Sequence, residues 1–150
     1  MAKNPVNPNI KAEKFEAYLK QRNLTFFVRD PVPNDNNGTV IYKTNLEAEG
    51  QTLPVGIIID STLYSVIRVQ VGTRLINPGN QASFMLFLNE LNRSYKVFKY
   101  VATDDGTLFL DACLPSTAES FEPHVVHVVL DVMANHLKDE YKTLMRKAWE

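Results

Sequence analysis

The 150-residue chain is poor in the residues that mark several common functional classes. Its single cysteine, Cys113, excludes an intramolecular disulfide and a paired CxxC motif. Its six glycines form no glycine-rich phosphate loop. No apolar run approaches the roughly 20 residues that span a bilayer, and the first ten residues, MAKNPVNPNI, lack the apolar core of a secretory signal. We therefore expect a cytoplasmic protein that has no membrane partner.

An excess of one charge is also missing from the sequence. The chain carries 16 basic and 17 acidic residues, which gives a formal net charge of −1 with neutral histidines. Such a balance provides no general attraction to nucleic acid. The aromatic residues that could stack on bases are not interleaved with a basic cluster. We therefore expect no nucleic-acid partner.

What the chain has in quantity is apolar residues, which make up 45% of it. At this length they suffice for one ordinary hydrophobic core, so we predict a single domain over residues 1–150. The most regular stretch is 81–114, where an apolar helix leads directly into a β-hairpin. Asp105-Gly106 favours a tight turn between the two strands because glycine readily adopts positive φ.

Two registers of this hairpin are possible. A two-residue turn would place Tyr100 opposite Asp111 and Lys99 opposite Ala112, whereas a three-residue loop places Lys99 opposite Asp111. We favour the three-residue loop because it collects the apolar residues on one face, and a slip would move this whole set to the other side. The expected buried face consists of Phe98, Tyr100, Ala102, Leu108, Leu110 and Ala112. The expected outer face consists of Val97, Lys99, Val101, Thr103, Thr107, Phe109, Asp111 and Cys113.

Upstream, the pattern predicts a helix followed by four strands. Asn7 is the expected N-cap and Pro8 the first helical residue, with an end near Asn23. Ile10, Phe15, Tyr18 and Leu19 form the expected apolar side, and Lys11, Glu13, Lys14 and Glu16 the solvated side. The predicted strands are 24–29, 39–46, 53–60 and 64–71, and a polar loop occupies 30–38. In the last two strands, alternation leaves Ile58, Val66, Arg68 and Gln70 outside. It places the following residues in the core: Val55, Ile57, Ile59, Ile67, Val69 and Val71.

Two further helices complete the predicted order. Asn77-Pro78 resembles a helix start, and the run 84–88 after it is apolar at five consecutive positions. This helix is therefore either buried on nearly all sides or part of an interface. Ser120 is the expected N-cap of a C-terminal helix that reaches about Lys147. Its predicted apolar stripe is Phe121, Val125, Val128, Val129, Val132, Met133, Leu137, Tyr141, Leu144 and Met145.

These elements predict an α+β fold in the order helix, four strands, helix, two strands, helix. The simplest arrangement is an antiparallel β-sheet meander with three helices packed on one side.

The sequence LNELN at 88–92, the strand at 98–100, Asp105-Gly106 and LFLDACLP at 108–115 resemble the bacterial YbjN family. That family is similar in fold to the class I type III secretion chaperones. The resemblance is strongest over 81–114. It differs at Tyr95-Lys96-Val97, where family members often have a glycine or another small residue. It implies a non-enzymatic regulator, adaptor or peptide-binding chaperone, often dimeric, with no catalytic residues and no cofactor.

Four groups of polar residues are candidates for a metal-binding or catalytic site. Asn89 and Asn92 share a helix face, and we expect structural roles for them: Asn92 at the helix-end carbonyls and Asn89 against the hairpin. His124, His127 and Asp131 have a spacing that could hold a divalent metal, but a solvated helix face explains them more simply. Cys113 lacks an evident cationic neighbour that would activate its thiol. The hairpin carboxylates form no acid–base pair. We therefore predict no metal site and no catalytic residues.

The leading functional hypothesis is a non-enzymatic protein that binds a protein or peptide client through the outer face of its sheet. The predicted partner-binding residues are Val66, Arg68, Val97, Lys99, Val101 and Phe109. A homodimer is also expected, through this face or through the 84–88 surface. Two alternatives remain: an enzyme or metal protein whose site is assembled from distant residues, and a purely structural homodimer.

Overall fold

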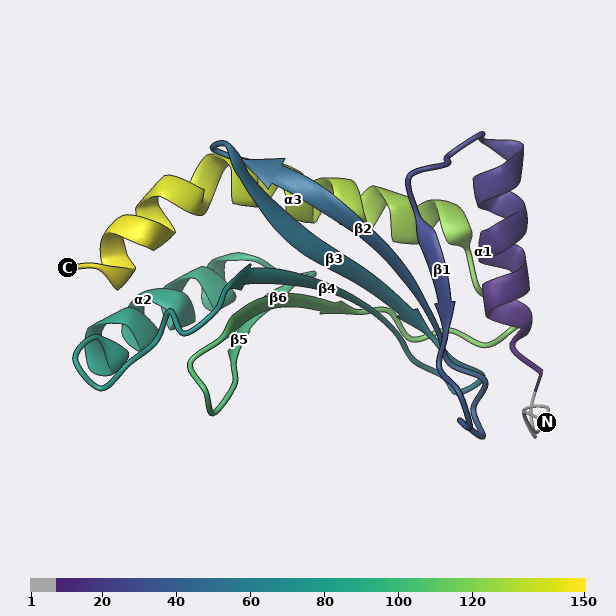
Figure 1. Cartoon of the computed structure of the whole chain (residues 1–150), viewed down its shortest axis with the longest axis horizontal. Helices are drawn as coiled ribbons and strands as arrows, with labels where there is room; N and C mark the ends of the chain where they lie inside the picture. The colour runs from purple at the N-terminus through teal and green to yellow at the C-terminus, as the bar shows by residue number, and fades with distance from the viewer. Residues whose placement is uncertain (1–7) are drawn as a thin grey trace.

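The computed structural model describes residues 8–150, which form one α+β unit with the predicted order of elements. Figure 1 shows α3 running along one side of a curved sheet, with α1 at one end and α2 at the other. Adjacent strands of the sheet are all antiparallel, in the order β1-β2-β3-β4-β6-β5. The elements are α1 (Ile10–Gln21), β1 (Val28–Pro31), β2 (Val40–Ala48), β3 (Gln51–Ile59), β4 (Ser65–Gly72), α2 (Gln81–Ser94), β5 (Lys99–Ala102), β6 (Leu108–Cys113) and α3 (Pro123–Ala148).

The core lies between the sheet and the helices. Strict alternation along β3 and β4 buries every second side chain, as expected for strands with one solvent-facing side. The predicted core positions of these strands are confirmed: Val55, Ile57, Ile59, Ile67, Val69 and Val71 are all buried. Ile58, Val66, Arg68 and Gln70 alternate with them and are only partly buried. We call the side of the sheet that carries these four residues the outer face.

The predicted hairpin register is confirmed. Lys99 lies opposite Asp111, and the Thr103 N–H donates to the Thr107 carbonyl at 3.0 Å around a three-residue loop. Gly106 has a φ of +83°, and a Cβ built on it would lie 2.1 Å from the carbonyl oxygen of Ile76. The loop therefore requires glycine for both its conformation and its packing. Thr107, expected on the outer face, is instead buried next to this contact.

The start of α1 differs from the prediction. Asn9 is the N-cap, its side chain accepting from the Ala12 N–H at 2.9 Å, and Pro8 precedes the helix. The predicted N-cap, Asn7, lies outside the described residues. Ile10 is exposed, whereas Lys11, expected on the solvated side, is 2% exposed. Lys11 occupies an inner position because its ammonium donates to the Tyr64 carbonyl at 2.8 Å and to Ser65 Oγ at 3.1 Å. Burial lowers the pKa of Lys11, against the opposing effects of Asp60 and Cys113.

The first strand was also predicted in the wrong place. The chain leaves α1 through Asn23, which has a φ of +54°, and the Leu24 N–H donates to the Leu19 carbonyl at 2.9 Å. This turn keeps residues 24–27 out of the sheet, so β1 covers only 28–31 instead of 24–29. The ends of β2, β3 and β4 lie within two residues of the predicted ones.

Helix α2 starts later than predicted. Asn77-Pro78-Gly79 forms a turn in which Asn77 Oδ1 accepts from the Gly79 N–H at 2.9 Å, and the helix begins at Gln81. The buried Asn80 amide donates to the Leu75 carbonyl and, at 2.8 Å, to the Ala148 carbonyl, which joins the start of α2 to the end of α3. In the apolar run 84–88, the helix buries Phe84 and Leu88 and exposes Met85 and Leu86. It is therefore not buried on nearly all sides.

The C-terminal helix begins with Pro123, three residues after the predicted N-cap Ser120. Ser120 bonds instead within the preceding turn, where its Oγ accepts from the Thr117 N–H at 2.9 Å. The buried stripe includes Phe121, Val129, Met133, Leu137 and Leu144 as predicted. Val125, Val128 and Val132, predicted in the same stripe, are exposed, while Val126 and Leu130 take inner positions. Apolar residues thus occupy more of the α3 surface than the part that is buried.

Asn92 protects the free edge of the sheet at β5. Its Oδ1 accepts from the Tyr100 N–H at 2.7 Å and its Nδ2 donates to the Tyr100 carbonyl at 3.2 Å, which imitates the pairing of a further strand. The contact expected of Asn89 is therefore made by Asn92, whereas Asn89 is exposed. The carbonyls at the end of α2 receive the Lys99 ammonium, which donates to Asn92 O at 2.5 Å and to Tyr95 O.

We expect Asn92→Ala to lower the free energy of unfolding by about 1–3 kcal/mol, because it leaves two strand groups without partners. Asn89→Ala is the matched control, on the same helix, and should change stability by less than about 0.5 kcal/mol. Urea denaturation followed by circular dichroism would measure both values. Equal losses in the two variants would contradict this role of Asn92.

A buried histidine makes the stability of the fold depend on pH. His136 of α3 is 8% exposed, its Nε2 lies 2.6 Å from the Tyr100 hydroxyl, and the Tyr95 and Phe98 rings each lie 4.5 Å from its ring. Burial among these rings lowers the pKa of His136, against the opposing effect of Asp139. The folded state therefore favours the neutral imidazole.

Because the folded pKa of His136 lies below its unfolded value of about 6.5, its neutral form contributes stability fully above that pH. This contribution is lost as the pH falls below about 6.5 toward the lower folded pKa. We expect His136→Asn to be less stable at pH 7.5 and to lose less additional stability between pH 7.5 and 5.5 than the unchanged protein. Urea denaturation at several pH values would test this, and parallel pH profiles would refute it.

Candidate functional site

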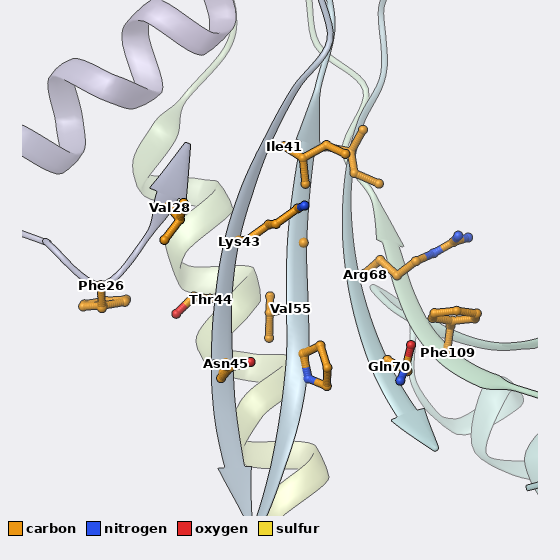
Figure 2. Close-up of a pocket in the computed structure, with 13 residues that line it drawn as sticks. Phe26, Val28, Ile41, Lys43, Thr44, Asn45, Val55, Arg68, Gln70 and Phe109 are labelled. Atoms are coloured by element: carbon orange, nitrogen blue, oxygen red, sulfur yellow. The ribbon is translucent and has the colours of Figure 1, made fainter. Parts of the chain in front are cut away.

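The outer face of the sheet is the candidate site, and its side chains lie in rows set by the strand register. One row joins Ile41, Ile58, Val66 and Cys113 across β2, β3, β4 and β6. The next row contains Val28, Lys43, Gly56, Arg68, Asp111 and Lys99. A third row contains Gln70, Phe109 and Val101. Figure 2 shows Lys43, Arg68 and Phe109 on the side of the strands turned away from α3.

A groove of about 450 Å³ is hollowed into this face, and we call it the outer-face groove. It lies over the centre of the sheet and extends to Phe26, which precedes β1, and to Val28, the first residue of β1; these side chains are 55% and 65% exposed. Gly56 lies in its lining, at the position where the other strands carry side chains. The main apolar lining residues are Phe26, Val28, Ile41, Pro54, Ile58 and Phe109.

Two cations border the apolar groove, each held by a neighbouring carboxylate. Arg68 Nε and Nη2 donate to the two carboxylate oxygens of Asp111 at 2.9 and 2.8 Å, and the guanidinium lies 4.7 Å from the centre of the Phe109 ring. The hydrogen bond to Asp111 raises the pKa of Arg68, which keeps this group charged. Lys43 Nζ lies 2.5 Å from Asp30 Oδ2. Fixed ion pairs thus border the groove at β2 and β4.

The structure brings together some of the six predicted partner-binding residues and not others. Arg68 and Phe109 both line the groove, Val66 lies in the adjacent row, and Val101 is paired with Phe109. Lys99 lies opposite Asp111 as predicted, but Arg68 takes the ion pair, and the Lys99 ammonium turns toward the end of α2.

Val97 was wrongly placed in the first hairpin strand. It lies in the bend between α2 and β5, because α2 ends at Ser94 and strand pairing starts only at Lys99. Its side chain is 39% exposed.

Sequence reasoning missed several lining residues, among them Phe26, Val28, Pro54 and Gly56. Phe26 and Val28 were missed because the first strand was placed four residues too early. A signal for Gly56 did exist, since a glycine inside a strand often marks a place where a ligand or another backbone approaches closely.

The histidine cluster of α3 is a contact between helices. The Tyr18 hydroxyl lies 2.8 Å from His127 Nδ1 and 3.3 Å from His124 Nδ1, which joins α1 to α3. His127 Nε2 lies 3.7 Å from Asp131. The prediction of a purely solvated face is therefore wrong for His127. Over residues 8–150, no group of three His, Cys, Asp or Glu side chains is arranged to hold a metal ion.

The other polar candidates have local roles. Asp105 Oδ1 accepts from Thr103 Oγ1 at 2.6 Å and from the Thr107 N–H at 3.0 Å, and these bonds lower the pKa of this carboxyl. Asp105 thus stabilises the hairpin loop. Cys113 is exposed on the outer face, in the same row as Val66.

None of the helices within residues 8–150 is both long and apolar enough to cross a membrane.

Comparisons with other proteins add no function to this geometry. No protein-family model matches the chain, and no curated protein matches it significantly. The YbjN resemblance therefore stays a prediction.

Proposed function

We propose that the protein binds a segment of another polypeptide in the outer-face groove and catalyses no reaction itself. The observation that carries this proposal is an apolar groove of about 450 Å³ on the side of the sheet opposite α3. Together with the YbjN resemblance, it supports a cytoplasmic regulator or chaperone-like adaptor that needs no cofactor. An extended segment suits the site because every second side chain points toward the sheet. These side chains can lie between the rows of side chains on the outer face.

The apolar lining is large enough to support such binding. Covering six apolar side chains could contribute on the order of 10 kcal/mol before the costs of association. Those costs are about 4 kcal/mol or more, so a dissociation constant of tens of micromolar or weaker is a reasonable expectation. The ion pairs beside the groove would direct a segment into one register, because a misplaced charge is costly.

A homodimer is a second proposal, favoured by α2. Leu86 is 68% exposed on the side of this helix turned away from Phe84 and Leu88, and Met85 beside it is 40% exposed. Exposed large apolar side chains on a helix can mark an interface. A dimer through α2 would leave the outer-face groove free for a client.

Charge replacements on the outer face test the binding proposal. Twelve-residue peptides selected from a random display library on the immobilised protein would serve as ligands, with fluorescence anisotropy as the measurement. We expect Phe109→Glu and Val66→Asp to weaken binding at least about tenfold, because each places a charge against apolar ligand atoms.

Val128→Asp on α3 is the control, since Val128 is 44% exposed and lies away from the outer face. It should leave peptide affinity unchanged. Thermal unfolding of each variant would separate loss of binding from loss of folding. Undiminished binding by well-folded Phe109→Glu and Val66→Asp variants would show that the site lies elsewhere.

Light scattering tests the dimer separately. A dimer has a mass near 34 kDa, twice that of the 17.0 kDa chain. We expect this mass for the unchanged protein and about half of it for Leu86→Glu, which places a charge in the proposed interface. Phe109→Glu should remain a dimer. A monomeric unchanged protein would exclude the dimer and leave the binding proposal intact.

A further inference from the structure

The lining of the outer-face groove indicates which kind of segment it takes, an inference that rests on the proposed function. Its centre is Gly56 of β3, whose cross-strand neighbours are Lys43 on β2 and Arg68 on β4. The groove therefore has one position without a side chain, flanked on both sides by a cationic residue. Strands lie about 4.8 Å apart, so the gap between these two neighbours is about 10 Å at the backbone.

The backbone gives no reason for glycine at this position. Gly56 is not among the glycines with positive φ, and a Cβ built on it would meet only Ile41 Cγ2, at an ordinary contact distance of 3.5 Å. Glycine inside a strand also weakens the sheet, because it offers no side chain to pack. Because Gly56 has no side chain, it leaves an empty space above the outer face of β3.

The polar lining is suited to a negative charge. Lys43 and Arg68 line the groove together with the side chains of Asn45 and Gln70, and no carboxylate side chain does. Asp30 and Asp111, which pair with the two cations, are outside the lining. A lysine or arginine of a bound segment would meet two like charges here, whereas a carboxylate would meet cations and the uncharged amides of Asn45 and Gln70.

Both cations can accept a further partner. Arg68 uses Nε and Nη2 for Asp111, and its Nη1 donates no hydrogen bond to any residue within 8–150. The Lys43 side chain is 54% exposed and has three donor protons, and Figure 2 shows it extending from β2 toward β3. Figure 2 shows Arg68 extending away from β3 toward Phe109, so Lys43 is the cation nearer to Gly56. A ligand oxygen over β3 could therefore bond to Lys43 while the existing pairs stay intact.

The apolar residues lie on both sides of this charged row. Ile41 and Ile58 belong to the row on one side, whereas Pro54 and Phe109 lie on the other side of Gly56. An apolar ligand side chain can thus lie over Gly56 in contact with these walls. In an extended segment the next residue points away from the sheet, so a carboxylate two residues along the chain would lie on the same side and within reach of Lys43.

We propose that the outer-face groove recognises an extended segment of a partner protein in which a bulky apolar residue and an acidic residue are separated by one residue. The apolar side chain lies over Gly56, and the carboxylate bonds to Lys43. Recognition of this pair distinguishes acidic–apolar segments from basic–apolar ones.

Four fluorescein-labelled ten-residue peptides of Gly and Ser would test the proposal by anisotropy. They differ only in the two residues on either side of a central Gly. These are Phe and Glu, Phe and Gln, Phe and Lys, or Ala and Glu, and each peptide is named below by these two residues, for example Phe-Glu. We expect Phe-Glu to bind most tightly and Phe-Gln about tenfold more weakly, since it lacks the charge-assisted hydrogen bonds. Phe-Lys and Ala-Glu should be weaker still. Raising the salt concentration should reduce the difference between Phe-Glu and Phe-Gln.

Two variants assign the effects to residues. Gly56→Leu fills the groove without a backbone clash and should weaken both Phe-Glu and Phe-Gln at least about tenfold. Lys43→Gln should weaken Phe-Glu and leave Phe-Gln unchanged. Lys142→Gln, a replacement of the same kind on the 79% exposed Lys142 of α3, should change neither. Unfolding temperatures confirm that each variant is folded.

The outcomes separate this inference from the proposed function. Equal affinity for Phe-Glu and Phe-Gln, with both lost in Gly56→Leu, would overturn the acidic preference and leave peptide binding in the groove intact. Unchanged affinity in Gly56→Leu would overturn the placement of the apolar residue. If neither these peptides nor the display-selected ones bind, the proposed function itself is wrong.

Discussion

The antiparallel register of the six strands determines the position of almost every residue considered above. Because successive side chains of a strand point to opposite faces, one register places Val55, Ile57 and Ile59 in the core and leaves Pro54, Gly56 and Ile58 on the outer face. A shift of one residue would reverse both sets. The hydrophobic core and the groove are thus two results of the same pairing, and changes to the groove can be made without touching the core.

Polar side chains then join the helices to this sheet at its ends. The Asn80 amide joins α2 to the end of α3, the Tyr18 hydroxyl joins α1 to the histidines of α3, and Lys11 bonds to the start of β4. Each contact satisfies groups that would otherwise be buried without partners, so each is costly to remove. They position the helices on one face and leave the other uncovered, as the binding proposal requires.

Much of the fold could be predicted from sequence because it depends on local chemistry. Asp105-Gly106 determined the hairpin loop, and alternation in β3 and β4 identified both faces correctly. What failed depended on distant partners. Nothing near Lys11 in the chain indicates that its ammonium donates to the Tyr64 carbonyl and to Ser65. Likewise, nothing near His127 indicates its contact with the Tyr18 hydroxyl. Asn9 was missed because Asn7 is an equally good cap in sequence. The start of α3 at Pro123 was missed because its N-cap, Glu122, makes no side-chain capping bond.

The candidate site was predictable only in part for the same reason. Phe109 and Arg68 follow from strand alternation, but the groove also needs Phe26, which reaches it from an irregular segment. Val97 was misplaced because a helix end and a strand start are both uncertain by a few residues, and Val97 lies between them.

The Asn92 contact also limits how copies of this protein can aggregate. An open sheet edge is a template on which further chains add strand by strand into fibrils. At β5 the Asn92 amide occupies the central backbone groups of that edge, and at the opposite edge β1 is only four residues long and contains Pro31. The protein can therefore expose apolar side chains on a sheet face while offering little backbone for ordered fibril growth.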